Sequence, residues 1–331
     1  MSNYITRPNG HDPTYQGPYT ATGVSLRLYT LTAQYARLAA TLDRYLNAMA
    51  GAGVYRPLGN KVIACFAAMD RVEGVNPQLG WMREIDVAFF IPTVRFDHLT
   101  PKFAMFAPYL FVDIPQAVAS GREVHGYRKD FGTSFSTVDT YADTWTAHAK
   151  DLSHVEAWAI AAPATRLRRL RLIDVTHPAA SSPPLTWNTP ADAITEVFEY
   201  LIGDLADLAL GLAPVFKLAA GALKGTLGAL LFPDFAALFQ GIDATMPIVF
   251  LRQFRNPGQT AQADVCQIVH ANTRLPLAKV SGRKLVDPYA LTFHDQASHP
   301  FSTELGVASG MPIASGLTLE LDCDFVLEEA L

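Results

Sequence analysis

The C-terminal segment "LTLELDCDFVLEE", residues 317–329, alternates apolar and polar positions. The alternation has a period of two and divides the side chains into two sets. The apolar set is Leu317, Leu319, Leu321, Cys323 and Phe325, and the polar set is Thr318, Glu320, Asp322 and Asp324. Successive side chains of a strand point to opposite faces, so one set would face a core and the other water. Half-buried strands of this kind are typical of antiparallel sheets. We therefore expect an antiparallel sheet that includes this segment.

Other runs also have strand composition, and they follow one another without a regular helix between each pair. They are residues 25–31, 61–70, 81–96, 103–121, 154–177, 246–254, 263–274 and 289–294, and the run 103–121 is expected to end in a turn or short helix before Gly121. Strands that alternate with helices would predict a parallel sheet, and this chain lacks that pattern. Half of its residues are apolar, enough for a large core or subunit interface. The expected fold class is α+β, β-rich, in a single domain over 1–331.

Two segments carry helical patterns. Residues 32–51 space their apolar side chains near 3.6, and Gly51 is suited to end a helix. Residues 190–245 are rich in Ala and Leu and predict a helical insertion. A membrane-spanning helix needs about 20 mostly apolar residues, and charges, Pro214 and Pro233 interrupt this stretch. We favour a hairpin packed on the sheets or between subunits, with a helix pair on a membrane surface as the alternative.

Charge and cysteine content argue against several functions. The formal net charge is −5, which offers no basic excess for nucleic acid or an anionic membrane surface. The short basic run 166–171 predicts a solvated edge strand. Three distant cysteines, Cys65, Cys266 and Cys323, make neither a disulfide framework nor a zinc cluster. Reduced thiols fit a cytoplasmic protein.

The remaining polar segments give no sign of a metal or cofactor. Residues 1–23 are polar and lack the apolar stretch of a secretory signal, so we expect an extended arm. His294, Asp295 and His299 lie close in sequence, but no further ligand has convincing spacing. Nucleotide-binding, zinc-protease and serine-hydrolase motifs are absent from the sequence.

The decapeptide "EVHGYRKDFG", residues 123–132, gathers six ionisable side chains in a chain in which only 17% of residues are charged. This concentration makes the decapeptide the candidate site of the chain. An ion-paired turn that only stabilises the fold is the structural alternative.

This region resembles the acetoacetate decarboxylase family. The residues that carry the resemblance are Asp113, Gly121, Arg122, Glu123, Tyr127 and Lys129. Other segments continue it in the same order along the chain: "GPY" at 17–19, "WMREIDVAFFIP" at 81–92, and 252–274 and 291–313. The resemblance covers 17–150 and 246–328 loosely, and the helical insertion has no counterpart.

The resemblance implies a fold and a chemistry. The family fold is an antiparallel cone- or barrel-like double sheet, usually assembled as a homo-oligomer. Lys129 would form a Schiff base with a small-molecule keto acid or ketone without any cofactor. The protonated imine then withdraws electrons, so that carbon dioxide can leave or an adjacent carbon–carbon bond can break or form. Glu84 matches the glutamate that transfers protons in the family pocket.

A nucleophilic lysine must lose its proton, although its ordinary pKa is about 10.4. Burial among apolar side chains would lower that pKa. Tyr127 and Cys65 are expected to line the substrate pocket. A substrate carboxylate would need an arginine. The three predicted for this role are Arg122, Arg27 and Arg128.

Some positions depart from the family pattern. Arg128 replaces a proline, Asp130 replaces a second lysine, and Ala64 or Cys65 stands where the family has a glutamate. Asp130 would raise the pKa of Lys129 if the two met, but neighbours in a strand point apart. Decarboxylation and aldol-type chemistry both stay open. A non-catalytic barrel that binds an apolar molecule, such as a polyketide or lipid, is the alternative.

Overall fold

The computed structural model describes eleven strands in one sheet, four in another and a few short helices. The described residues are 14, 17–74, 80–96, 102–132, 154–176, 185–186, 244–275, 281–285, 289–313 and 316–330. The helical insertion predicted over 190–245 falls almost wholly outside them. Within these ranges no helix is long and apolar enough to cross a membrane.

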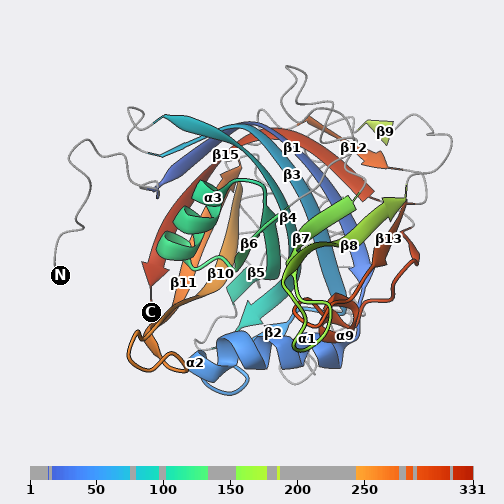
Figure 1. The fold of residues 1–331 in the computed structure, drawn as a ribbon. Coiled ribbons are helices and arrows are strands. Elements are labelled where there is room, and N and C mark those ends of the chain that lie inside the picture. Colours follow the sequence, from blue (N-terminus) through green and yellow to red (C-terminus); the bar gives the residue numbers. More distant parts are fainter. Residues whose placement is uncertain are drawn as a thin grey trace, which may run out of the picture.

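The large sheet is built from long strands that curve across the molecule (Figure 1). Its hydrogen-bonded order is β1 (Tyr19–Thr32), β3 (Lys61–Gly74), β4 (Trp81–Arg95), β5 (Lys102–Val112), β10 (Ala244–Arg255), β11 (Ala263–Leu275), β15 (Gly316–Ala330), β12 (Ser281–Leu285) and β9 (Leu185–Thr186). Two short strands join it, β2 (Tyr55–Pro57) on β4 and β6 (Lys129–Phe131) on β5. The predicted β-rich α+β class is confirmed.

Strand β15, the last strand in the sequence, pairs with β1, the first. It pairs with β1 over Gly316–Phe325 and with β11 over Asp324–Ala330, while β12 pairs with its first residues. These pairings are antiparallel, as the alternation in this segment predicts. Two pairings of β5, with β10 and with β6, are parallel and depart from the expected all-antiparallel sheet. The cone- or barrel-like shape stays a prediction.

The second sheet is small. Its order is β14 (Pro312–Ile313), β13 (Tyr289–Phe293), β8 (Arg168–Thr176) and β7 (His154–Ala159). The basic run lies at the exposed start of β8, where β7 pairs with it, and β13 pairs with β8 only from Ile173 onward. The arginines there are solvated, as expected, and Arg169 and Arg171 pair with Glu156 and Asp174.

The helices are short. Residues Tyr35–Leu42 form α1, a π-helical turn follows at Asp43–Asn47, and α2 covers Ala48–Ala50. Gly51 ends this segment at φ 105°, which confirms the predicted helix stop. Helix α3 (Pro115–Ser120) lies within the curve of the large sheet, whereas α9 (Phe301–Leu305) lies beside α1 (Figure 1).

Strands β3, β4 and β5 of the large sheet are buried on both faces. Along β3, Val62, Ala64, Phe66 and Ala68 belong to one apolar cluster, whereas Ile63, Cys65, Ala67 and Met69 belong to another. This strand therefore reads as a continuous apolar run. The face that carries Met69, called here the α3 face, holds the candidate site. The predicted arm over 1–23 is shorter than expected, because β1 begins at Tyr19.

Candidate functional site

Lys129 is the first residue of β6, and its side chain is almost wholly buried on the α3 face. Helix α3 and a π-helical turn, Gly121–His125, precede it in the chain. The amides of Gly126 and Tyr127 donate hydrogen bonds to the carbonyl of Gly121 and so end the turn. This reversal lays Gly121 against the lysine side chain. A Cβ on Gly121 would lie 2.8 Å from Cδ of Lys129, so glycine leaves room for the amine.

Two carboxylates of β4 face the amine. Nζ of Lys129 lies 2.5 Å from Oε1 of Glu84 and 3.6 Å from Oδ2 of Asp86. Glu84 and Asp86 are two residues apart and so share one face of the strand. Asp113 lies behind them, where its Oδ1 accepts a hydrogen bond from the amide of Ile85 at 2.9 Å.

Burial and charge oppose each other at this site. Burial by itself lowers the pKa of Lys129, but Asp86 and Glu84 outweigh it and raise that pKa above its ordinary value. Burial and the neighbouring Glu84 raise the pKa of Asp86 well above that of an ordinary aspartate. The resting site is therefore an ammonium paired with Glu84, beside an aspartic acid that retains its proton more readily than usual.

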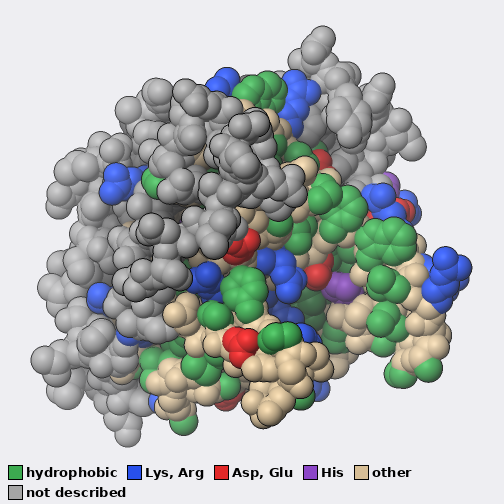
Figure 2. Space-filling view, turned by 60° about the vertical axis from the view of Figure 1, so that its left-hand side comes forward, with side chains coloured by type: hydrophobic (Ala, Val, Ile, Leu, Met, Phe, Trp, Pro, Cys, Tyr) green, Lys and Arg blue, Asp and Glu red, His purple; other side chains and the backbone are tan. Residues whose placement is uncertain are grey.

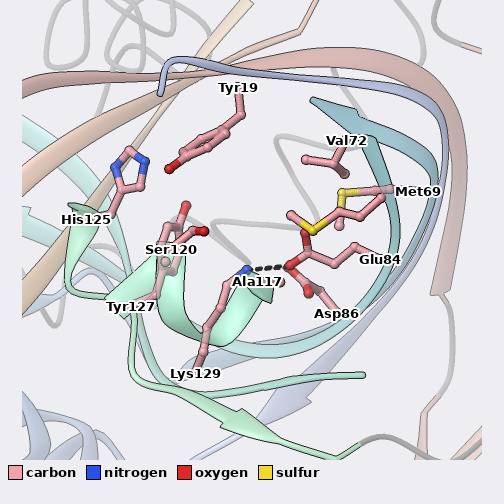
Figure 3. A pocket seen from close by; sticks show the side chains of 12 residues that line it. Tyr19, Met69, Val72, Glu84, Asp86, Ala117, Ser120, His125, Tyr127 and Lys129 are labelled. Atoms are coloured by element: carbon pink, nitrogen blue, oxygen red, sulfur yellow. Dashed lines mark hydrogen bonds and ion pairs between the residues drawn. The ribbon is translucent and has the colours of Figure 1, made fainter. Parts of the chain in front are cut away.

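The amine opens into a small cavity of about 50 Å³. Its lining comes from β1, β3, β4, α3 and the turn after α3. The lining residues are Tyr19, Met69, Val72, Met82, Glu84, Asp86, Ala117, Ser120, Gly121, His125, Tyr127 and Lys129. Figure 3 shows the Lys129–Glu84 pair on one side, with His125 and Tyr19 across from Glu84.

The structure brings three of the residues predicted from the sequence together. Lys129 and Glu84 form the ion pair, and Nζ lies 5.4 Å from the ring centre of Tyr127. Cys65 is buried on the same face of β3, but it is not among the residues that line the cavity. Asp130 points away from the amine, as expected, and lies 3.3 Å from Nε2 of His299.

The three predicted arginines lie outside the cavity. Arg27 pairs with Phe66 across β1 and β3 and therefore faces the cluster on the opposite side of the sheet. Arg122 is exposed, and its Nη1 donates to the backbone oxygen of Lys129 at 3.4 Å. Arg128 is also exposed, with its guanidinium 4.2 Å from the ring centre of Tyr45. Strand neighbours alternate in direction, which sends Arg128 away from Lys129.

Three ionisable lining residues, Asp86, His125 and Tyr19, were not identified from the sequence. Asp86 could have been found, because a period of two places it beside Glu84. His125 lies inside the ionisable decapeptide but carries no spacing signal of its own. Tyr19 comes from β1, and only the long-range pairing of β1 with β3 places it at the cavity.

Charges elsewhere on the described surface are mixed. On the face drawn in Figure 2, Lys and Arg side chains lie among acidic and hydrophobic ones. His294 and His299, considered as a metal-binding pair, lie against different carboxylates, those of Asp174 and Asp130. The described residues contain no group of three or more His, Cys, Asp or Glu side chains placed to hold a metal.

The fold is that of the acetoacetate decarboxylase-like proteins. Acetoacetate decarboxylase from Legionella pneumophila superposes with a TM-score of 0.52 at 13% identity, over 95% of this chain and 88% of that one. A second acetoacetate decarboxylase superposes with a TM-score of 0.53 at 13% identity, over 99% and 95% of the two chains. The resemblance predicted from the sequence is thus confirmed for the fold.

A further solved structure is an acetoacetate decarboxylase-like enzyme from Sphingomonas wittichii. Its TM-score is 0.48 at 12% identity, over 95% of this chain and 94% of that one. No protein-family model matches the sequence, and no curated protein is significantly similar to it.

Proposed function

We propose that this protein is a cofactor-independent carbon–carbon lyase that forms a Schiff base between Lys129 and a small keto acid or ketone. The observation that carries the proposal is a buried lysine amine that lines a cavity, with a carboxylate 2.5 Å away. A lysine in such a place has few structural uses, because burying its charge is costly. The decarboxylase-like fold adds support.

Glu84 would provide the base that Lys129 needs. As a substrate displaces water, the ammonium transfers its proton to Glu84, and the neutral pair avoids two buried charges. The nitrogen then attacks the carbonyl carbon, and the carbonyl oxygen leaves as water after protonation. Glu84, which then carries the proton, and Asp86, whose pKa is raised by burial, are the two acids beside the nitrogen for that step.

The iminium carbon then accepts the electron pair of an adjacent bond. A keto acid loses carbon dioxide, or a hydroxyketone releases an aldehyde, and either leaves an enamine on Lys129. A carboxyl group returns a proton to the enamine carbon, and water hydrolyses the imine. Decarboxylation and aldol-type cleavage or condensation share these steps. A homo-oligomer and a cytoplasmic location stay predictions.

Borohydride trapping tests the proposal. Incubation with ketones and sodium borohydride should leave an adduct at Lys129, mapped by peptide mass spectrometry. Lys129→Met should lose the adduct, whereas Lys102→Met, which changes an exposed lysine, should keep it. Absence of any adduct across a panel of keto acids and ketones would reject the Schiff base.

A non-catalytic binding protein is the second candidate. The raised pKa of Lys129 favours it, because an amine that keeps its proton is a poor nucleophile. In that case Lys129→Ala would leave the affinity for an apolar ligand unchanged. Native mass spectrometry of the purified protein would reveal a retained polyketide or lipid.

A further inference from the structure

His125 lines the cavity and forms no side-chain hydrogen bond with the described residues. Its side chain is 2% exposed, and both ring nitrogens lack a hydrogen-bond partner among the described residues. Its ring lies 5.6 Å from the ring of Tyr19 and 5.5 Å from the ring of Tyr127, measured between ring centroids. Buried polar atoms nearly always have partners, so these nitrogens call for one inside the cavity.

The imidazole is neutral. Burial, together with Lys129 and Arg252, lowers the pKa of His125 to about 4. A neutral ring has one N–H donor and one acceptor nitrogen. It is therefore suited to a hydroxyl, amide or second carbonyl group, and it provides no positive charge for a carboxylate.

The rest of the lining argues against an anionic substrate. Among the described lining residues Lys129 is the one cation. Its ammonium group already pairs with Glu84 and Asp86. Arg122 and Arg128 lie outside the cavity. A substrate carboxylate would lose its hydration without gaining a counter-charge, which is unfavourable in a buried site.

We infer that the cavity selects an uncharged ketone that carries a second polar group, and that His125 hydrogen-bonds this group while the carbonyl faces Lys129. This assignment rests on the proposed function and narrows its substrates from keto acids and ketones to neutral ketones. The rings of Tyr19 and Tyr127 both pack against the imidazole ring (Figure 3).

A matched set of ligands tests the inference. 4-Oxopentanamide and 4-oxopentanoate differ in charge but hardly in shape, and 2-pentanone lacks the second polar group. Equilibrium binding of each to the full-length protein is measured by ligand-observed NMR titration at neutral pH, without borohydride. We expect the amide to bind about tenfold more tightly than the carboxylate.

Variants of His125 show whether the imidazole is responsible. His125→Phe keeps the ring volume and should weaken binding of the amide about fivefold or more, to the level of 2-pentanone, whose own binding stays unchanged. His125→Asn should restore part of the amide affinity. His294→Phe, a change of an exposed histidine away from the cavity, serves as the control, and thermal melts show that each variant is folded.

The outcomes separate the two proposals. Equal or tighter binding of the carboxylate overturns the neutral-ketone assignment, and so does an amide affinity that His125→Phe leaves unchanged. Borohydride trapping of the same ligands is then read separately. If the amide binds selectively but no adduct forms at Lys129, the selectivity stands and the Schiff-base lyase fails.

Discussion

Burial and neighbouring charges shift the pKa of the Lys129 amine in opposite directions. A dry cavity alone would lower its pKa, which is what the sequence predicts for a nucleophile. Asp86 and Glu84 on β4 outweigh burial and raise that pKa instead. The neutral amine of Lys129 therefore forms only when its proton passes to Glu84 as a substrate arrives. Lys129 and Glu84 titrate as a coupled pair.

Glu84→Gln should lower the pKa of Lys129, because it removes the nearest negative charge. The rate of reductive methylation at Lys129 is followed by mass spectrometry from about pH 9 to about pH 10, below the pKa of the wild-type amine. A pKa lower by about one unit makes the neutral amine about tenfold more abundant there, so the variant should react about tenfold faster. Asp130→Asn is the matched control, since Asp130 faces His299. An unchanged methylation rate in Glu84→Gln would mean that the ion pair does not control the amine.

Asp113 should make the protein less stable as the pH rises from about 4 to about 6. Burial, with a contribution from Glu84, raises its pKa to about 6 in the folded state, against about 3.9 in an unfolded chain. Between these values the folded protein binds more protons than the unfolded chain, so the free energy of unfolding falls with pH.

Asp113→Asn should remove this dependence and raise the free energy of unfolding at pH 7 by about 1–3 kcal/mol. Its amide oxygen can still accept the hydrogen bond from Ile85. Urea denaturation near pH 4.5 and pH 7 measures the difference. Parallel pH profiles for the two proteins would contradict the assignment.

Among the elements, the segment from α3 to β6 determines where the site lies. Its π-helical turn ends at Gly126, which has φ 82° and lies against β10. A Cβ there would lie 2.5 Å from Cα of Arg252, a contact with backbone that cannot give way. This close approach packs the turn on the sheet and presents His125 and Lys129 to one cavity.

Gly126→Ala should therefore destabilise the protein by about 3 kcal/mol or more, through strain at a positive φ and a clash with β10. Gly80→Ala is the matched control. Gly80 has φ 88°, and among the described residues no atom lies within 4 Å of the position that a Cβ would take, so the expected cost is the strain of about 1 kcal/mol. Thermal and urea denaturation compare the two, and equal losses would show that the contact with β10 is unimportant.

For the whole molecule, β15 connects strands from both ends of the chain. It hydrogen-bonds to β1, β11 and β12, and β1 in turn pairs with β3, whose neighbour β4 carries Glu84. The site thus depends on strands that are far apart in sequence. Such long-range pairing forms only when the whole sheet forms.

Deletion of residues 316–331 should abolish cooperative unfolding, because it leaves long edges of β1 and β11 without partners. Circular dichroism during heating, together with the soluble yield, measures the effect. Deletion of Leu331 alone is the control. A cooperative melt within a few degrees of the full-length protein, from the larger deletion, would show that β15 is dispensable.

The sequence by itself determined the β-rich class, most strand positions, the helix that stops at Gly51 and the proximity of Lys129 to Glu84. It did so because a period of two specifies which side chains share a face, and because the family-like motif placed two segments together. Only the tertiary structure decided that Arg27, Arg122 and Arg128 stay outside the cavity while His125 and Tyr19 enter it. The direction of a side chain beyond its own strand depends on a π-helical turn, a close glycine contact and long-range strand register, and none of these leaves a periodic signal in the chain.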